Sequence, residues 1–588
     1  MDVAATVAEI EQGLLSEVSV DDGWRLIERF SSLVRESGMP DEHTAADYIA
    51  AELERLGVEY TMHEPDLYLS LPRDARVVVH AEGEGEGKDE FRAKPPAFAA
   101  STGAEGASGP GVYLEVPSMR DLGEIFADRH QGRNESVRGK VVVTNGYAMP
   151  ATVARFERAG AVAQVYINPG ENIHWGICTP IWGTPTGDNL QFKPSTPVVA
   201  VNKPDGDALV LALSQGQSEV TVHAQLDEGW FPCKLPVATI AGASDDFLLV
   251  HGHYDSWDVG IGDNAVGDAT LLELARVFHS QRDRLKRSLK IAWWPGHSTG
   301  RYAGSTWFAD KFALELRKHC VAAVNIDSPG CWKASAFEDV MWMAEADQLC
   351  RDSISAVTGQ TAGRRRPIRA GDYSFNQIGL TSFFMLLSNI PNEERKELGF
   401  YPVGGCGGNV AWHTEDDVLN IADRKYLEQD LRVYVTAIGR ALNGDVLPFD
   451  HREAAKEMGA ALAEYDQQAA GLIDLSAVHQ ELEALQSELE SFYDAVGSGT
   501  LDAAIANRTI TELSRILVPL NYARGARFDH DPALPLGTIP VLDNIATLRS
   551  LADAGSERLP FVRAEIARAV NRVANALYEA TELVRGHR

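Results

Sequence analysis

The stretch Phe247-Leu248-Leu249-Val250-His251-Gly252-His253-Tyr254-Asp255-Ser256 decides how this chain folds. It opens with an apolar run that is typical of a strand buried on both faces of a sheet. The segment from Asp268 to Phe278 follows, and its apolar spacing predicts an amphipathic helix. A strand that leads into a helix is the repeating unit of an α/β sheet, so the polar residues between them should lie where the strand ends.

The alternation of strand and helix continues along the chain. Apolar strand patterns recur at 289–293, 322–327 and 382–386, with helix patterns between them. Such alternation favours a mostly parallel, mixed sheet that is sandwiched by helices. We therefore predict an α/β fold, and we assign residues 1–75 plus 231–449 to this domain.

The chain has 588 residues, which is too long for a single core, so further domains are expected. Residues 76–230 contain short strand patterns, such as 139–144 and 162–167, and predict a β-rich insertion. Within it, residues 172–191 form a long irregular segment of the kind that often covers a functional site. Residues 450–588 contain long periodic runs rich in Leu and Ala, which predict a helical domain suited to dimerisation.

Composition narrows the class of protein. A formal net charge of −30 argues against nucleic-acid binding, which needs a basic face. No apolar run reaches the roughly 18 residues of a membrane span, and the first residues lack the pattern of a secretory signal. The six cysteines form no Cys-x-x-Cys pair, so we expect reduced, buried thiols. These features together predict a cytoplasmic protein that does not associate with membranes.

Four potential metal ligands lie at the ends of separate elements. His253 follows the strand of the opening stretch, Asp263 lies ten residues further on, and Asp327 ends another strand. His413 lies in the segment Trp412-His413-Thr414. Imidazole and carboxylate groups that meet at the edge of an α/β sheet can bind a divalent metal ion, so we predict a metal site there.

These residues also carry a resemblance to a known family. The segments Gly252-His253-Tyr254-Asp255-Ser256, Asp263-Asn264-Ala265, Asn325-Ile326-Asp327, Gly371-Asp372-Tyr373-Ser374-Phe375 and His413-Thr414 resemble those of the co-catalytic dizinc aminopeptidases and glutamate carboxypeptidases. Residues 139–168 resemble the protease-associated domain that such peptidases often carry as an insertion. The helical region 450–588 resembles the dimerisation domain of the carboxypeptidase and transferrin-receptor branch, which implies a homodimer.

The resemblance implies a role for each ligand. His253 and Asp327 would hold one metal ion, Asp263 would bridge two, and His413 would hold the second. Asp255 would accept a proton from the ring of His253 and fix its tautomer, a catalytic role exerted through the ligand. The cofactor would be one or two divalent ions, with zinc favoured and manganese or cobalt as alternatives.

The chain departs from the family where two adjacent glutamates, a general base and a metal ligand, are expected. It reads Pro295-Gly296-His297-Ser298-Thr299-Gly300-Arg301-Tyr302 instead. An ungapped alignment puts Ser298 and Thr299 at the two positions, and a shift of two residues puts Gly296 and His297 there. We favour the shifted alignment, with His297 as a ligand and catalytic residue, because hydroxyl groups are poor zinc ligands.

The shifted alignment leaves the position of the general base empty. Glu415, Asp416 and His251 are candidates that the sequence does not rank, and His251 is equally explained as a packing residue of the strand. Loss of a general base typically costs on the order of 10²–10⁴ in rate.

Two pairs of residues are candidates for substrate binding. Arg365 and Arg366 belong to the densest basic cluster of the chain, just before Asp372, and guanidinium groups bind carboxylates through two parallel hydrogen bonds. Arg301 and Tyr302 adjoin the altered glutamate position. A solvated loop is the alternative interpretation of the basic cluster.

Two functions remain open at this stage. The first is a metal-dependent hydrolase in which metal-activated water cleaves an amide or peptide-type bond of a small substrate, acidic or neutral. The second is a catalytically inactive peptidase homologue that acts as a binding or scaffold protein. Retention of His253, Asp255, Asp263, Asp327 and His413 together favours the hydrolase, because a site without metal has no need to bury so many polar groups.

Overall fold

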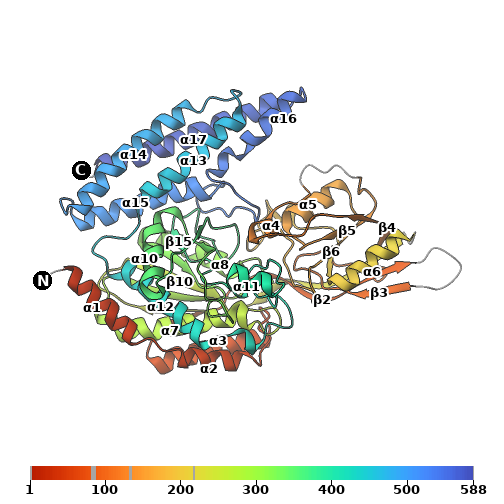
Figure 1. Ribbon diagram of the computed structural model, residues 1–588, viewed down its shortest axis with the longest axis horizontal. Coiled ribbons are helices and arrows are strands. Elements are labelled where there is room, and N and C mark those ends of the chain that lie inside the picture. Colours follow the sequence, from red (N-terminus) through yellow and green to blue (C-terminus); the bar gives the residue numbers. More distant parts are fainter. Residues whose placement is uncertain (1–2, 81–87, 131–135, 216–218, 587–588) are drawn as a thin grey trace.

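The computed structural model describes residues 3–80, 88–130, 136–215 and 219–586, which fold into three parts (Figure 1). The central α/β part contacts both of the others. The insertion extends from one side of it, and the C-terminal helices lie across another side. The predicted fold class, an α/β sandwich with a β-rich insertion and a C-terminal helical region, is confirmed.

The central sheet has six strands. Strand β10 (Phe247–His253) lies between β11 (Ser288–Trp294) and β12 (Cys320–Asn325), and it is parallel to both. β15 (Thr381–Phe383) continues the parallel arrangement beyond β12. The other edge is antiparallel and is formed by β9 (Leu235–Ile240) and β1 (Glu59–His63). The carboxyl ends of β10, β11 and β12 therefore meet at one edge, and this edge positions the site.

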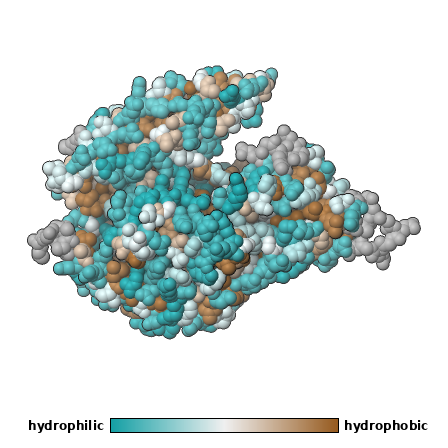
Figure 2. Space-filling model, viewed as in Figure 1, coloured by the Kyte–Doolittle hydropathy of each residue, from teal (hydrophilic) through white to brown (hydrophobic). Residues whose placement is uncertain are grey.

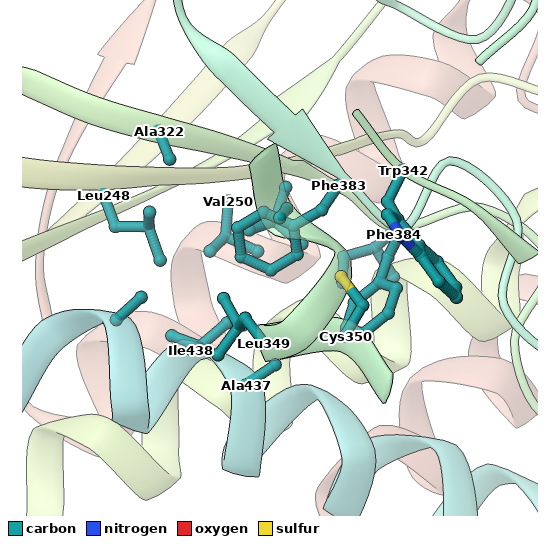
Figure 3. Close-up of a cluster of buried hydrophobic side chains, with 14 of the residues drawn as sticks. Leu248, Val250, Ala322, Trp342, Leu349, Cys350, Phe383, Phe384, Ala437 and Ile438 are labelled. Carbon is teal, nitrogen blue, oxygen red and sulfur yellow. The ribbon is translucent and has the colours of Figure 1, made fainter. Parts of the chain in front are cut away.

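Helices cover both faces of the central sheet, as the continuous apolar run of β10 requires. Leu248 and Val250 point to one face and belong to the main core, whereas Phe247 and Leu249 belong to a separate cluster on the other face. Figure 3 shows Leu248 and Val250 close to Ile438, a residue of helix α12 (Arg424–Asn443). The remaining helices around the sheet are α1 (Val3–Ser16), α2 (Asp21–Phe30), α3 (Pro40–Leu56), α7 (Val266–Ser280), α8 (Ala303–Lys311), α9 (Ala313–His319) and α10 (Asp347–Thr358).

The insertion contains a seven-stranded mixed sheet of order β3-β2-β8-β4-β5-β6-β7. Its long strand β2 (Asp66–His80) begins ten residues before the predicted start of the insertion at residue 76. Leu67, Leu69 and Leu71 of β2 pack against Ala303 of α8, so this strand leads directly from the α/β part into the insertion. The other strands are β3 (Lys88–Arg92), β4 (Ala107–Leu114), β5 (Val141–Asn145), β6 (Ala163–Ile167), β7 (Val198–Val201) and β8 (Glu219–Pro232), and the helices are α4 (Leu122–Phe126), α5 (Pro150–Ala159) and α6 (Lys203–Ser214).

The C-terminal helices are joined to the central part through a continuous core. Arg515 is fully buried at this junction and donates hydrogen bonds to the backbone carbonyls of Gly379 and Arg317. The helices are α13 (His451–Ala469), α14 (Ser476–Gly497), α15 (Ala503–Tyr522), α16 (Leu548–Asp553) and α17 (Leu559–Gly586). Figure 2 shows a mostly hydrophilic surface on the face drawn, with scattered hydrophobic residues. Within the described residues, none of the helices combines the length and apolar character needed to cross a membrane.

Candidate metal centre

Asp263 connects two imidazole groups at the edge of the sheet. Its Oδ1 lies 2.9 Å from Nε2 of His253, the last residue of β10, and its Oδ2 lies 3.1 Å from Nε2 of His413. The buried carboxylate of Asp417 holds the backbone of this loop, because it accepts hydrogen bonds from the backbone N–H groups of Gly262 at 2.6 Å and of Asp263 at 2.9 Å. Asp417 therefore fixes the backbone that carries the carboxylate of Asp263.

Three of the predicted ligands form one compact group. Potential ligand atoms of His253, Asp263 and Asp327 all lie within 4.8 Å of one another. Nε2 of His253 and Oδ1 of Asp263 are buried and contact each other as an ion pair at 2.9 Å, but neither atom makes a hydrogen bond of good geometry with the described residues. Buried polar atoms are rarely left without a partner, and a nitrogen with two carboxylates is a donor set suited to zinc. The residues present therefore fit a divalent metal ion.

The charges of this group depend on one another. Burial opposes a positive charge on His253, but the carboxylates of Asp255 and Asp263 raise its pKa well above the ordinary value. Burial likewise opposes a negative charge on Asp263, yet the two histidines bring its pKa well below the ordinary value. Burial, and then repulsion by Asp263, raise the pKa of Asp327 to about 6. A cation between these carboxylates would relieve that repulsion.

Asp255 lies close to His253 but contacts it differently from the prediction. The hydrogen bond of His253 Nδ1 is to the backbone carbonyl of Asp255 at 2.9 Å, whereas the carboxylate lies 3.6 Å away. The Asp255 carboxylate accepts the backbone N–H groups of His297 at 3.2 Å and of Ser298 at 2.9 Å. Asp255 therefore ties the end of β10 to the segment that follows β11.

The irregular segment of the insertion orients His413. The Nδ1 atom of His413 lies 3.0 Å from the backbone carbonyl of Trp175, and the backbone N–H of Trp175 donates to the carbonyl of His413 at 2.8 Å. The ring of Trp175 stacks on that of Trp257, with centroids 5.4 Å apart. This reciprocal pair directs Nε2 of His413 towards Asp263.

His297 lies in the site but outside the compact ligand group. Its ring stacks face to face on that of His253, with centroids 3.7 Å apart. Its Nδ1 lies 2.6 Å from Oδ2 of Asp372. Burial by itself would raise the pKa of Asp372, but the nearby His297 lowers it below the ordinary value. Because an ionised carboxylate can only accept, Nδ1 of His297 carries the hydrogen and Nε2 is left as an acceptor.

Asp372 is itself held by a chain of hydrogen bonds. The hydroxyl of Ser305 donates to its Oδ1 at 2.6 Å and also contacts the hydroxyl of Ser374 at 2.8 Å. The indole N–H of Trp182, from the insertion, donates to Ser374 at 2.8 Å. Every member of this chain is buried, so the position of His297 is fixed by residues from both parts of the molecule.

One cavity opens onto the metal centre. Asp263, His297, Asp327 and His413 line it together with Arg301 and Tyr302, two of the predicted substrate-binding residues. Its remaining walls are mainly apolar and aromatic, and they come from the insertion as well as from the α/β part: Ile125, Phe126, Tyr147, Met149, Trp175, Ile177, Ile368, Met385, Leu386 and Trp412.

Arg365 and Arg366 do not line this cavity. Arg365 pairs with Asp339 at 2.7 Å and borders a neighbouring cavity. Arg366 pairs with Glu457 and donates to the backbone carbonyl of Asn521 at 2.5 Å, at the junction with the C-terminal helices. Both side chains form ion pairs within the protein, and their placement gives no support to the prediction that they bind substrate.

The three candidate general bases also lie outside the cavity lining. Glu415 accepts a hydrogen bond from Lys94 at 2.7 Å, and Asp416 accepts one from Asn172 at 2.6 Å. His251 is buried beside Trp294 and Phe375, and burial lowers its pKa to about 4. Packing therefore accounts for His251.

Three functional contacts were missed by the sequence analysis. Asp372 was noted only as part of a motif, and Asp417 and the backbone of Trp175 were not considered. The signal for Asp372 was present, because a carboxylate beside a glycine in a site motif can orient a histidine. The contact of Trp175 with His413 joins residues 238 positions apart and has no local signal in the sequence.

Comparison with known proteins agrees with this fold. Residues 237–435 match the profile of peptidase family M28. The probable glutamate carboxypeptidase VP8 of Zea mays is 24% identical over 345 residues, which is 50% of this chain and 48% of that protein. The inactive zinc metalloprotease C354.09c of Schizosaccharomyces pombe is 24% identical over 268 residues, which is 43% of this chain and 32% of that protein. The chain thus matches about half or less of the length of these relatives.

Solved structures share the fold at low sequence identity. A peptidase M28 precursor from Shewanella amazonensis superposes with a TM-score of 0.54 and 17% identity, over 76% of this chain and 98% of that one. The zinc aminopeptidase BSAP of Bacillus subtilis gives a TM-score of 0.53 and 17% identity, over 73% and 96%. Residues 237–435 thus resemble peptidase family M28, and the predicted resemblance to the zinc aminopeptidases and glutamate carboxypeptidases is confirmed.

Proposed function

We propose that this chain is a metal-dependent hydrolase that cleaves an amide or peptide-type bond in a small substrate. The observation that carries the proposal is the compact, buried group of His253, Asp263 and Asp327, whose potential ligand atoms lie within 4.8 Å of one another. A divalent ion bound there would supply a Lewis acid for a carbonyl group and for water.

The geometry favours one principal ion, with zinc as the first choice. His253, Asp263 and Asp327 provide three ligands for it, which is the usual number at a catalytic zinc site. A second ion would have only His413 and the shared Asp263 from the predicted set. The glutamate that would complete this second position is missing from the sequence, so we expect it to bind more weakly.

His297 is better suited to accept a proton than to bind the metal ion. Rings that stack face to face direct their nitrogen lone pairs along parallel planes rather than towards one point, and the stack with His253 has an interplanar angle of 15°. Asp372 orients His297 through Nδ1 and leaves Nε2 as the acceptor. His297 would then take a proton from the attacking water and return it to the leaving amine, and Asp372 would stabilise the imidazolium.

The surrounding residues would restrict access of bulk water to this reaction. The insertion contributes Trp175 and Trp182, which hold His413 and the Asp372 chain, respectively. The cavity walls are largely apolar, which strengthens electrostatic interactions inside the cavity.

The test measures metal content and hydrolysis separately. Purified protein is stripped with a chelator, reloaded with zinc, manganese or cobalt, and assayed against a panel of aminoacyl and N-acyl amides. We expect about one tightly bound ion per chain and metal-dependent hydrolysis. His297→Ala should keep the metal and lose on the order of 10²–10⁴ in kcat. Loss of metal in this variant would instead identify His297 as a ligand, and a wild type that binds less than half an equivalent would refute the proposal.

A second candidate function has two observations in its favour. The glutamate pair is absent from the sequence, and one of the similar proteins carries the description inactive zinc metalloprotease. A non-catalytic binding protein would retain the metal ion for stability but hydrolyse no amide in the panel. Dimerisation through residues 450–588 also stays a prediction, which light scattering of the purified protein would test.

A further inference from the structure

Arg301 lies at the start of α8, between the altered glutamate position and the helix. Its φ is +49° and that of Tyr302 is +71°, so two consecutive residues adopt a left-handed conformation just before the helix begins. The backbone carbonyl of Arg301 accepts a hydrogen bond from Gly183 of the insertion at 2.6 Å. This turn carries Arg301 to the wall of the cavity that opens onto the metal centre.

Arg301 is buried, and its guanidinium forms neither a hydrogen bond nor an ion pair with the described residues. The residue is 4% exposed. Its Nε is among the buried atoms that lack a hydrogen-bond partner there, and the guanidinium lies over the ring of Tyr302, 5.2 Å from the ring centroid. A buried cation is strongly unfavourable unless it is paired, so this arrangement calls for an anion.

The other buried arginines form the hydrogen bonds that the guanidinium of Arg301 lacks. Arg35 donates to the carbonyls of Tyr254, Val259 and Gly260, and Arg369 donates to those of Tyr373 and Asp531. Arg287 and Arg515 likewise donate to backbone carbonyls. Among the buried arginines in the described part of the chain, Arg301 alone lacks such contacts, and it alone shares a cavity with the metal ligands.

We propose that Arg301 binds the free carboxylate of the substrate, and that the substrate is a small amide that carries both this carboxylate and an apolar group. The class includes N-acyl amino acids and the carboxy-terminal residue of short peptides. The apolar group would lie against Ile125, Phe126 and Met149 of the insertion, which line the same cavity. A guanidinium suits a carboxylate because it offers two parallel donors. This inference rests on the proposed hydrolase function and specifies its substrate class.

The experiment compares two probes that differ only in charge. Binding of N-acetyl-L-phenylalanine and of N-acetyl-L-phenylalaninamide to the zinc-loaded protein is measured by calorimetry. We expect wild type to bind the carboxylate at least about tenfold more tightly than the amide, because charge-assisted pairs are markedly stronger than neutral ones. Arg301→Gln should bring the two affinities within threefold of each other, and Arg301→Lys should retain part of the preference. The matched control, Arg365→Gln, should behave as wild type because Arg365 lies outside this cavity.

Two results would overturn the proposal. One is a wild type without preference for the carboxylate, including the case in which neither probe binds. The other is an Arg301→Gln variant that keeps the preference, since the carboxylate would then be bound by the metal ion or by another residue. Failure of the proposed function itself would appear differently, as absence of bound metal or of hydrolysis in wild type.

Thermal unfolding separates this role from a structural one. If Arg301 only balanced the buried carboxylates of the site at long range, Arg301→Met should unfold at a lower temperature than wild type. If Arg301 awaits a ligand, Arg301→Met should unfold at the same or a higher temperature, because the variant no longer buries an unpaired charge. A lower unfolding temperature together with an unchanged preference for the carboxylate would favour the structural role.

Discussion

Replacing Asp263 with asparagine tests the metal centre without any knowledge of the substrate. The side chain keeps its size, but one of the two carboxylate oxygens becomes an amide NH₂. In the structure these oxygens lie 2.9 Å from His253 Nε2 and 3.1 Å from His413 Nε2, so asparagine can present an oxygen to only one of them. The backbone contact of residue 263 with Asp417 uses the N–H group and is unaffected.

The expected effect follows from linkage between metal binding and folding. An ion present at 100 times its Kd stabilises the folded state by about 2.7 kcal/mol. The α/β part, residues 1–75 plus 231–449, has about 300 residues, so at an unfolding entropy of about 2.1 cal/mol/K per residue 1 kcal/mol shifts its Tm by about 1.6 °C, and zinc should raise this Tm by about 4 °C. Changes to residues that only support ligands weaken metal binding by about 10–100-fold, and the loss of a ligand carboxylate should reach at least the upper value. At a 100-fold higher Kd the same zinc concentration stabilises by only about 0.4 kcal/mol, which is a shift of about 1 °C.

The assay is thermal unfolding of chelator-treated protein with and without added zinc. The measured quantity is the zinc-induced shift of Tm, because Asp263→Asn also removes ion pairs with two histidines from the metal-free protein. Asp416→Asn is the matched control, since Asp416 follows His413 closely in the chain but contacts Asn172 outside the cavity. A zinc-induced shift that is the same in Asp263→Asn and in wild type would refute the role of Asp263 as a ligand.

Three further predictions follow from the same contacts. Asp372→Asn should keep the metal ion but lower kcat by on the order of 10²–10⁴, because the amide NH₂ would face Nδ1 of His297 and reverse its tautomer. Ser305→Ala removes one hydrogen bond to Asp372 and should lower kcat by less than about tenfold. Equal effects of the two variants would argue against the role of Asp372 in orienting His297. Zinc affinity, measured by competition with a chelator, should fall as the pH drops from 8 to 5, because His253, whose pKa is raised well above its ordinary value, must lose a proton to bind zinc, and because Asp327, whose pKa is raised to about 6, also takes up a proton at the lower end of this range; a flat profile would contradict this. Burial raises the pKa of Asp430 to about 7, so between about pH 4 and pH 7 the folded state holds a proton that the unfolded state releases, and wild type loses stability as the pH rises through this range. The Tm of Asp430→Asn minus the Tm of wild type should therefore be larger at pH 8 than at pH 5. An equal difference at the two pH values would contradict this.

Local patterns were sufficient to predict the strands and the polar residues at their ends. The apolar run before His253 specified a strand buried on both faces, and the parallel arrangement of β10, β11 and β12 then brings their carboxyl ends to one edge. His253, Asp263 and Asp327 meet for this reason. This meeting of side chains could be predicted because the period of the pattern and the position of a polar residue at the end of the strand are both local properties.

The parts that could not be predicted depend on contacts between distant segments. Trp175 reaches His413 only because the insertion folds back over the α/β part. Arg365 and Arg366 seemed available for a substrate, but Asp339 and Glu457 pair with them in the folded chain. A cluster of charged residues in a sequence will pair with opposite charges, but the sequence does not indicate whether those charges belong to the protein or to a ligand.

The charges of the segment between β11 and α8 favour a substrate that carries a carboxylate over one that carries a free ammonium group. Where the resemblance implies two glutamates, this segment presents His297 and, four residues later, Arg301, so the cavity has lost two carboxylates and gained a guanidinium. An aminopeptidase substrate carries a free ammonium group, which an unpaired guanidinium in the same cavity would repel. A carboxylate would pair with it and would also balance the charge of a bound divalent ion. We therefore expect N-acyl amino acids to be hydrolysed in preference to aminoacyl amides with a free amino group; the reverse order, measured as kcat/KM on matched pairs, would show that Arg301 does not set the charge of the substrate.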